Sequence, residues 1–227
     1  MKVGAPMSNA IETMLERALG AVLAGDQALR EALDELPAAI YVTDADGVIT
    51  YFNPACIDFT GRRPEVGADR WCVTWRLLTN AGEFLPHDEC PMAVAINTQR
   101  PIRGVTAVAE RPDGTRVNFR PYPTPIFDKD GKFAGAVNIL EDVTDEVRAE
   151  DFRAQARRCR RLATAVADDF AADTLSRMAE EYEAKAVELL GHKRFANSDG
   201  DGDGMDQARA PTPGVNAPDA VVGVPRL

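Results

Sequence analysis

The sequence predicts an α+β protein built around one antiparallel β-sheet, and two observations support this class. Apolar residues recur at spacings of three and four in residues 8–36 and 145–191, which is the period of an amphipathic helix. Between these regions, short β-rich runs flank three turn sequences that each end in glycine, at residues 44–47, 111–114 and 128–131. Consecutive hairpins of this kind are typical of an antiparallel sheet.

The predicted sheet has five strands, two before a helical crossover at residues 53–103 and three after it. Within the crossover, Asp88 is expected to cap a short helix over residues 91–96. The helical pattern before the sheet breaks at Gly25 and stops at Pro37, because proline cannot continue a helix. We therefore expect short helices between the second and third strands, and helical segments on either side of the sheet along the chain.

Residues 145–191 are expected to form a helical hairpin. Two apolar stripes at coiled-coil spacing predict its helices: Phe152, Ala156, Cys159, Ala163, Val166 and Phe170, then Leu175, Met178, Tyr182, Ala186 and Leu189. Acidic residues at 168, 169 and 173 predict the break between them. The first helix carries a run of five arginines at residues 153–161 with no acid among them, and the second helix is acidic. This favours pairing within the hairpin or with a dimer mate over contact with nucleic acid.

The predicted organisation has four parts. They are an N-terminal helical extension at residues 1–27, a domain at 28–144, the hairpin at 145–191 and a disordered tail at 192–227 that is rich in Gly, Pro and Asp.

Composition excludes several classes of function. The 227 residues carry a formal charge of −10, which argues against a nucleic-acid binder that relies on overall charge. No apolar run approaches the roughly 20 residues of a membrane span, and the first residues lack the apolar stretch of a signal peptide. We therefore expect a cytoplasmic protein without a membrane partner. The four cysteines form no C-x-x-C pair, and two histidines are too few for a multi-histidine metal site.

The middle of the chain resembles a PAS domain of the kind found in bacterial sensor proteins and upstream of histidine kinases. Residues 36–55 and 59–61 carry the resemblance at its start, and residues 135–144 match the last strand and its Asp-x-Thr exit. Residues 71–75 and 85–93 look like the variable central part of that subtype. The resemblance covers about residues 28–144, which is about half of the chain.

The resemblance implies a curved sheet whose concave face, covered by short helices, is either a filled core or a small-ligand cavity. Candidate cavity residues are Tyr41, Phe52, Phe59, Trp71, Trp75, Phe119 and Tyr122, with Arg116 or Arg120 available for a carboxylate. Signals would leave through the helix after the last strand. Asp142 and Thr144 would clamp that junction, unless they only cap the helix.

Two cofactor hypotheses follow from the same resemblance. Flavin photoreceptors of this family need a short Asn-Cys-Arg-Phe motif, which the sequence lacks around Cys56, Cys72 and Cys90. His87 and Cys90 lie where haem-binding members draw an axial ligand, but His87 could equally end a loop while Cys90 packs inward. The identity of any cofactor stays unknown from the sequence.

No output domain follows the hairpin in this sequence, and residues 145–191 contain no histidine that a kinase could phosphorylate. The leading hypothesis is a non-catalytic sensor that binds a small ligand and acts as a homodimer. Its flanking helices would signal to a protein partner in a two-component-type pathway. The alternatives are a ligand-free adaptor that docks a kinase or regulator, and a haem-based redox or gas sensor.

Overall fold

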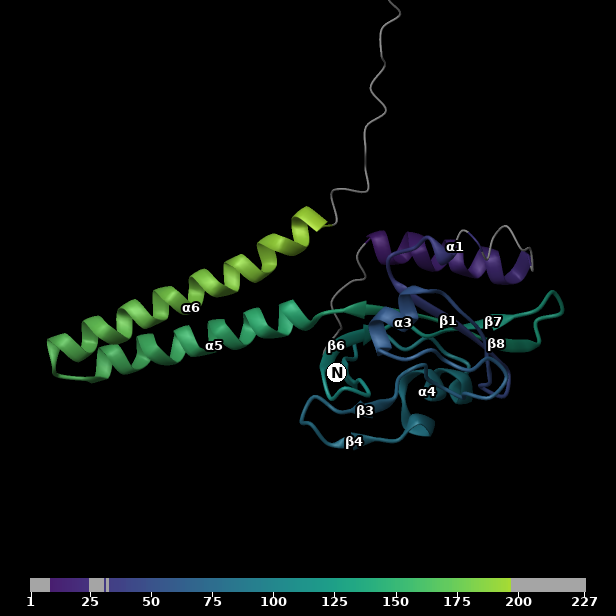
Figure 1. Ribbon diagram of the computed structural model, residues 1–227, viewed down its shortest axis with the longest axis horizontal. Coiled ribbons are helices and arrows are strands. Elements are labelled where there is room, and N and C mark those ends of the chain that lie inside the picture. The colour runs from purple at the N-terminus through teal and green to yellow at the C-terminus, as the bar shows by residue number, and fades with distance from the viewer. Residues whose placement is uncertain (1–8, 25–30, 32, 197–227) are drawn as a thin grey trace, which may run out of the picture.

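The computed structural model of the chain describes residues 9–24, 31 and 33–196 (Figure 1). Its helices are α1 (Asn9–Ala24), α3 (Ala55–Thr60), the 3-10 helix η1 (His87–Glu89), α4 (Pro91–Thr98), α5 (Thr144–Ala165) and α6 (Asp169–Ala196). Its strands are β1 (Ala39–Asp44), β2 (Ile49–Phe52), β3 (Arg76–Leu78), β4 (Phe84–Leu85), β5 (Ala107–Glu110), β6 (Arg116–Pro121), β7 (Thr124–Phe127) and β8 (Phe133–Asp142).

The strands form one antiparallel sheet in the order β2-β1-β8-β6-β5-β3-β4, and β7 also pairs with β8. Among the described residues the sheet has eight strands, so the expectation of five was wrong in number although right in class. The added β3 and β4 contain three and two residues, too few for an alternating pattern to show. In addition, β6 and β7 lie along the same side of β8, with Tyr122 and Pro123 between them.

The two faces of the sheet are buried by different segments. On one face, α3, α4 and the loops around them cover a core that includes Tyr41, Met92 and Phe119. On the other face, α1 packs Ile11 and Leu15 among aliphatic residues of β1, β7 and β8. Figure 1 shows α1 lying along the sheet on the side away from α4. Alternate residues of β1 therefore enter two separate cores.

The short helix expected over residues 91–96 is α4, but its cap differs from the prediction. The Cys90 side chain accepts a hydrogen bond from the Ala93 amide at 3.4 Å and Pro91 occupies the first turn. Asp88 lies in η1 and does not cap α4. The helix therefore begins from a buried sulfur instead of a surface carboxylate.

The helical hairpin is present as α5 and α6, which pack side by side and project away from the sheet (Figure 1). Asp168 accepts a hydrogen bond from the Phe170 amide at 3.0 Å, which confirms the expected break. Ala156, Cys159, Ala179 and Ala186 are buried between the helices. At the tip of the hairpin the predicted apolar stripe is not buried between the helices, as the side chain of Phe170 is 78% exposed.

The described part of the hairpin contains an ion pair between its two helices and another within one helix. Arg160 reaches Glu183 across the two helices at 3.3 Å, whereas Arg157 pairs with Glu150 of its own helix. The helix α6 extends to Ala196, five residues beyond the predicted end of the hairpin at residue 191, so residues 192–196 of the predicted tail are helical. The remaining tail, residues 1–8 and most of the predicted helix before Pro37 lie outside the described residues. No helix in the described part of the chain combines the length and apolar character of a membrane span.

Candidate functional site

Five of the predicted cavity residues gather on the α3/α4 face of the sheet. Tyr41, Phe59 and Phe119 are buried there, while Phe52 and Trp71 pack against the edge of the same core. The rings of Phe59 and Phe119 meet edge to face with centroids 5.6 Å apart. These residues contact one another and other core side chains, so this face holds a packed core.

The structure does not bring the other candidates into this core. Trp75 is 60% exposed, and Tyr122 lies in the core on the opposite face, beneath α1. Arg116 lies at the surface, where it pairs with Glu110 at 2.8 Å, and Arg120 pairs with acids near α5. Aromatic or cationic character alone carries no information on which face a side chain occupies, which is why the sequence grouped them together.

A buried tyrosine links the core to the last strand. The Tyr41 hydroxyl donates a hydrogen bond to the Trp71 carbonyl at 3.0 Å and accepts one from Asn138 Nδ2 at 3.0 Å. Burial, followed by the nearby Cys72 and Cys90 thiols, raises the pKa of Tyr41 well above its usual range. Sequence analysis missed Asn138, although an amide inside the apolar run of residues 136–140 was a visible signal.

Four neighbouring residues form what we call the thiol cluster: Cys72, Thr74, His87 and Cys90. The Thr74 hydroxyl donates to Cys72 Sγ at 3.2 Å and lies 3.4 Å from His87 Nε2. The Cys90 thiol donates to the Trp71 carbonyl oxygen at 3.9 Å, which places it beside Cys72, the next residue in the chain. Both cysteines are buried.

The hydrogen bond between the two thiols separates their acidities. It lowers the pKa of Cys72 to about 6, with His87 and Thr74 adding to the effect against the cost of burial. The same bond, together with burial, raises the pKa of Cys90 well above its usual value, because Cys90 holds the shared proton. The cluster therefore favours one thiolate and one thiol near neutral pH.

Polar contacts continue from Asn138 to the exit helix. Its Oδ1 accepts a hydrogen bond from the Tyr122 amide at 2.9 Å, and the Tyr122 hydroxyl donates to Glu141 Oε2 at 2.8 Å. Arg120 joins that Glu141 at 2.8 Å to Glu146 of α5 at 3.3 Å. We call this series, from Tyr41 to Glu146, the buried polar chain.

The predicted exit residues lie where β8 becomes α5. Asp142 accepts a hydrogen bond from the Thr144 amide at 2.8 Å, and Thr144 Oγ1 accepts one from the Asn118 amide of β6 at 3.0 Å. The Val143 amide donates to the Asn118 carbonyl at 2.9 Å. Three hydrogen bonds thus fix the first turn of α5, two of them to β6.

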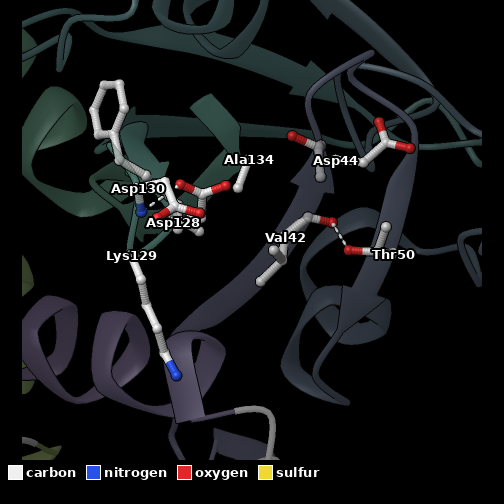
Figure 2. Close-up of a pocket in the computed structure, with 10 residues that line it drawn as sticks. Val42, Asp44, Thr50, Asp128, Lys129, Asp130 and Ala134 are labelled. Carbon is white, nitrogen blue, oxygen red and sulfur yellow. Dashed lines mark hydrogen bonds between the residues drawn. The ribbon is translucent and has the colours of Figure 1, made fainter. Parts of the chain in front are cut away.

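An open cavity of about 470 Å³ lies on the α1 side of the sheet, where Val42 and Ile126 form part of its floor. It is bounded by the two turns that carry Asp44 and Asp128, and Figure 2 shows Lys129 extending from the second turn toward a neighbouring helix. The carboxylates of Asp44 and Asp128 accept amide hydrogen bonds within their own turns. This is not the face on which the sequence placed a ligand.

The residues near α4 do not fit haem. Cys90 Sγ already accepts the Ala93 amide at the start of α4, and His87 Nε2 faces Thr74 at 3.4 Å. Tyr41, Met92 and Phe119 fill the adjacent core, so a macrocycle would have to displace them. Within residues 9–24, 31 and 33–196, no three His, Cys, Asp or Glu side chains are grouped so that they could hold a metal ion.

Comparison with protein families gives one match, to the model described as the PAS fold, over residues 33–148. The match covers just over half of the chain. This chain belongs to the PAS-fold family. Membership supports a role as a sensory signalling module, since PAS domains are generally sensory and non-catalytic.

Solved structures of PAS and light-oxygen-voltage domains are similar to the PAS domain of this chain. An RNA-binding light-oxygen-voltage receptor is 26% identical with a TM-score of 0.43, over 64% of this chain and 38% of that chain. A PAS domain from Colwellia psychrerythraea is 19% identical with a TM-score of 0.34, over 50% and 92%. The light-state dimer of the fungal photoreceptor Vivid is 18% identical with a TM-score of 0.38, over 63% and 100%.

This chain therefore spans well under half of the RNA-binding receptor's length. A search of the curated proteins gives no match.

Within the PAS domain, Cys56 lies on α3, where its thiol donates to the Ile40 carbonyl at 3.2 Å. Burial raises the pKa of Cys56 far above its usual value, so this thiol is protonated and inert.

Proposed function

We propose that this PAS domain senses a change on the α3/α4 face of its sheet and relays it through α5 and α6 to a protein partner. The observation that carries the proposal is the buried polar chain, which runs from Tyr41 in the core to Glu146 in α5. The module would act without catalysis, in the cytoplasm, in a two-component-type pathway.

The strand β8 is the physical basis of the relay. It carries Asn138, whose side-chain amide donates a hydrogen bond to the Tyr41 hydroxyl in the core on the α3/α4 face. It also carries Glu141, whose carboxylate accepts hydrogen bonds from Arg120 and Tyr122. One residue, Val143, separates β8 from α5. A shift of Asn138 along the sheet would therefore change the contacts that orient the first turn of α5. Coupling of this kind needs an element with two arrangements, and the exit junction is the candidate.

The packed core supports a second candidate, a ligand-free adaptor. Tyr41, Met92 and Phe119 are at most 2% exposed and leave the α3/α4 face filled. A small-molecule sensor would need this core to open, or would use the cavity near Lys129. Native mass spectrometry and an absorption spectrum of the freshly purified chain separate the two: a reproducible added mass or chromophore supports a bound ligand, and the bare mass supports the adaptor.

We also propose that the hairpin mediates homodimerisation and partner contact. Three apolar residues near its tip are exposed by 48%, 39% and 78%, namely Leu162, Val166 and Phe170. Apolar side chains grouped at the end of a helical pair are typical of contact surfaces. Light scattering would show a dimer for the natural chain and a monomer for Phe170→Asp. A dimer that tolerates this change would contradict the assignment.

The relay is tested by hydrogen exchange of the first turns of α5 in two matched variants of β1. Tyr41→Phe removes the hydroxyl of the buried polar chain, while Ile40→Val trims the neighbouring residue, which faces α1. Each change costs roughly 1 kcal/mol of unfolding free energy. We expect Tyr41→Phe to accelerate exchange of residues 144–150 at least threefold relative to Ile40→Val. Equal exchange in both variants would overturn the relay.

A further inference from the structure

Two cysteines of the thiol cluster contact each other in the core on the α3/α4 face. Cys72 lies in the loop before β3 and Cys90 caps α4, so the pair joins two segments that are 18 positions apart in the sequence. Cys90 Sγ lies 3.9 Å from the carbonyl oxygen of Trp71, the residue before Cys72, both side chains belong to the same core cluster, and both thiols are free. A relay that only transmits packing changes has no need of paired sulfurs, so the pair calls for a chemical explanation.

The surroundings of the pair favour thiolate chemistry. Cys72 Sγ accepts the Thr74 hydroxyl at 3.2 Å, with His87 on the far side of that hydroxyl. Cys90 Sγ accepts a hydrogen bond from the Ala93 amide at the start of the eight-residue helix α4, so the second sulfur is held in a fixed position. His87 is only half-buried, which brings the cluster close to solvent. Neighbouring groups that lower the pKa of a thiol make a cysteine more reactive, and Cys90, His87 and Thr74 act on Cys72 in this way.

We propose that Cys72 and Cys90 are a redox-modified dithiol that hydrogen peroxide converts to a disulfide. The Cys72 thiolate attacks one peroxide oxygen, the O–O bond breaks, and Cys72 becomes a sulfenic acid while hydroxide leaves. The Cys90 sulfur then attacks the Cys72 sulfur, the S–O bond breaks, and the leaving hydroxide takes the Cys90 proton as water. Two thiols and one peroxide thus give one disulfide and two waters.

The disulfide would act on the start of the buried polar chain. Residue 71 precedes Cys72, has a left-handed backbone with φ of 68°, and its carbonyl accepts the Tyr41 hydroxyl. Pulling Cys72 toward α4 would move this carbonyl relative to Tyr41. This consequence rests on the proposed relay, whereas formation of the disulfide does not. In a reducing compartment such a bond is transient and suited to sensing.

The experiment treats the full chain with hydrogen peroxide, blocks remaining thiols with N-ethylmaleimide and maps the peptides by mass spectrometry. We expect a cross-linked Cys72–Cys90 peptide, a mass lower by about 2 Da that dithiothreitol restores, and loss of the cross-link in Cys72→Ser and Cys90→Ser. The control is Cys56→Ala, which removes the nearby protonated thiol and should keep the cross-link. Near-ultraviolet circular dichroism confirms that each variant is folded.

Three outcomes would overturn the site: a bond to Cys56, a dimer linked through Cys159, or overoxidation of Cys72 without a disulfide. The mapped natural chain decides this even if a serine variant does not fold. Hydrogen exchange of residues 144–150 in the oxidised chain separates the two proposals. A disulfide that leaves this exchange unchanged contradicts the relay alone. If exchange is faster in Tyr41→Phe but peroxide forms no disulfide in the natural chain, only the dithiol proposal is contradicted.

Discussion

The two faces of the sheet are built from the same strands but have different chemistry. The α1 face is lined by aliphatic residues such as Ile40, Val42 and Ile139. The α3/α4 face contains three of the four cysteines and the hydroxyl of Tyr41. Since β1 and β8 supply both faces, alternate residues carry alternate roles. The comparison teaches that one face holds the helix in place, while the other holds groups whose state can change.

The largest expected effect is a loss of stability when an apolar side chain is removed from the core beneath α1. Ile139→Ala removes a fully buried side chain from this core and leaves a cavity. We expect a loss of about 4 kcal/mol in unfolding free energy, measured by urea denaturation. Peroxide cross-linking of the folded variant should be unchanged. A variant that loses the cross-link while folded would show that the two faces are not separate.

The next prediction concerns Asn53, the polar residue that ties the two faces together at the start of α3. Its Oδ1 accepts the Ile40 amide at 2.8 Å, and its Nδ2 donates to the Leu33 and Ala38 carbonyls at 3.1 and 2.9 Å. Asn53→Ala leaves these buried groups unpaired, so we expect a loss of about 3 kcal/mol. The matched control is exposed Asn80→Ala, which should change stability by less than about 0.5 kcal/mol. Equal losses would contradict the role of Asn53.

A third prediction sharpens the chemical side of the comparison. A thiol pKa of about 6 for Cys72 means that its thiolate forms as the pH rises through 6. Cys90, whose pKa is raised, keeps its proton at that pH. At pH 7 the thiolate fraction is then roughly ninetyfold that of a thiol with a pKa near 9. In the Cys90→Ala variant, iodoacetamide labelling of Cys72 should have its midpoint at a higher pH, because the donor thiol is gone. His87→Gln should move it the same way.

The charged and titratable groups that act on Cys72 in that experiment are Cys90, His87, Tyr41 and Cys56. Labelling of Cys72 that rises only above pH 8 in the natural chain would contradict the assignment. Cys56 serves as an internal control, because burial raises its pKa and should leave it unlabelled throughout.

The smallest effect is a gain in stability. Thr43 is buried on β1, and its Oγ1 has no hydrogen-bond partner in the described structure. Thr43→Val replaces the hydroxyl with a methyl group of similar size, so we expect unfolding to become harder by about 1 kcal/mol. Thr60→Val is the contrast, since that hydroxyl donates to the Cys56 carbonyl at 2.8 Å and its loss should destabilise. A destabilised Thr43→Val variant would point to a partner for that hydroxyl.

The sequence predicted the parts of the fold that depend on local patterns. The hairpin turns at residues 44–47 and 128–131 and the break at Asp168 all follow from short-range hydrogen bonding, and the structure has them. The strands β3 and β4 escaped prediction because they contain only three and two residues, and β3 is placed in the sheet by pairing with β5, 30 to 34 positions later in the chain. Local periodicity cannot report such contacts.

The candidate site was harder to predict for the same reason. Tyr41 and Tyr122 are both buried tyrosines, yet they face opposite cores because of their positions along β1 and after β6. The contact between Cys72 and Cys90 depends on how the loop before β3 meets α4. The sequence suggested Cys90 as a haem ligand or as a side chain that packs inward, and nothing in the spacing of Cys72 and Cys90 marked them as a pair.

The stiff connection between β8 and α5 has a mechanical consequence. The helix α5 contains 22 residues and is therefore roughly 33 Å long, and it begins one residue after the sheet ends. A rotation of about 5° at its base would sweep the far end of the hairpin through about 3 Å, which is comparable to the helix shifts of known switches. In the proposed relay the hairpin would therefore act as a lever arm: it would turn a displacement too small to disturb a packed core into one that a binding partner can distinguish.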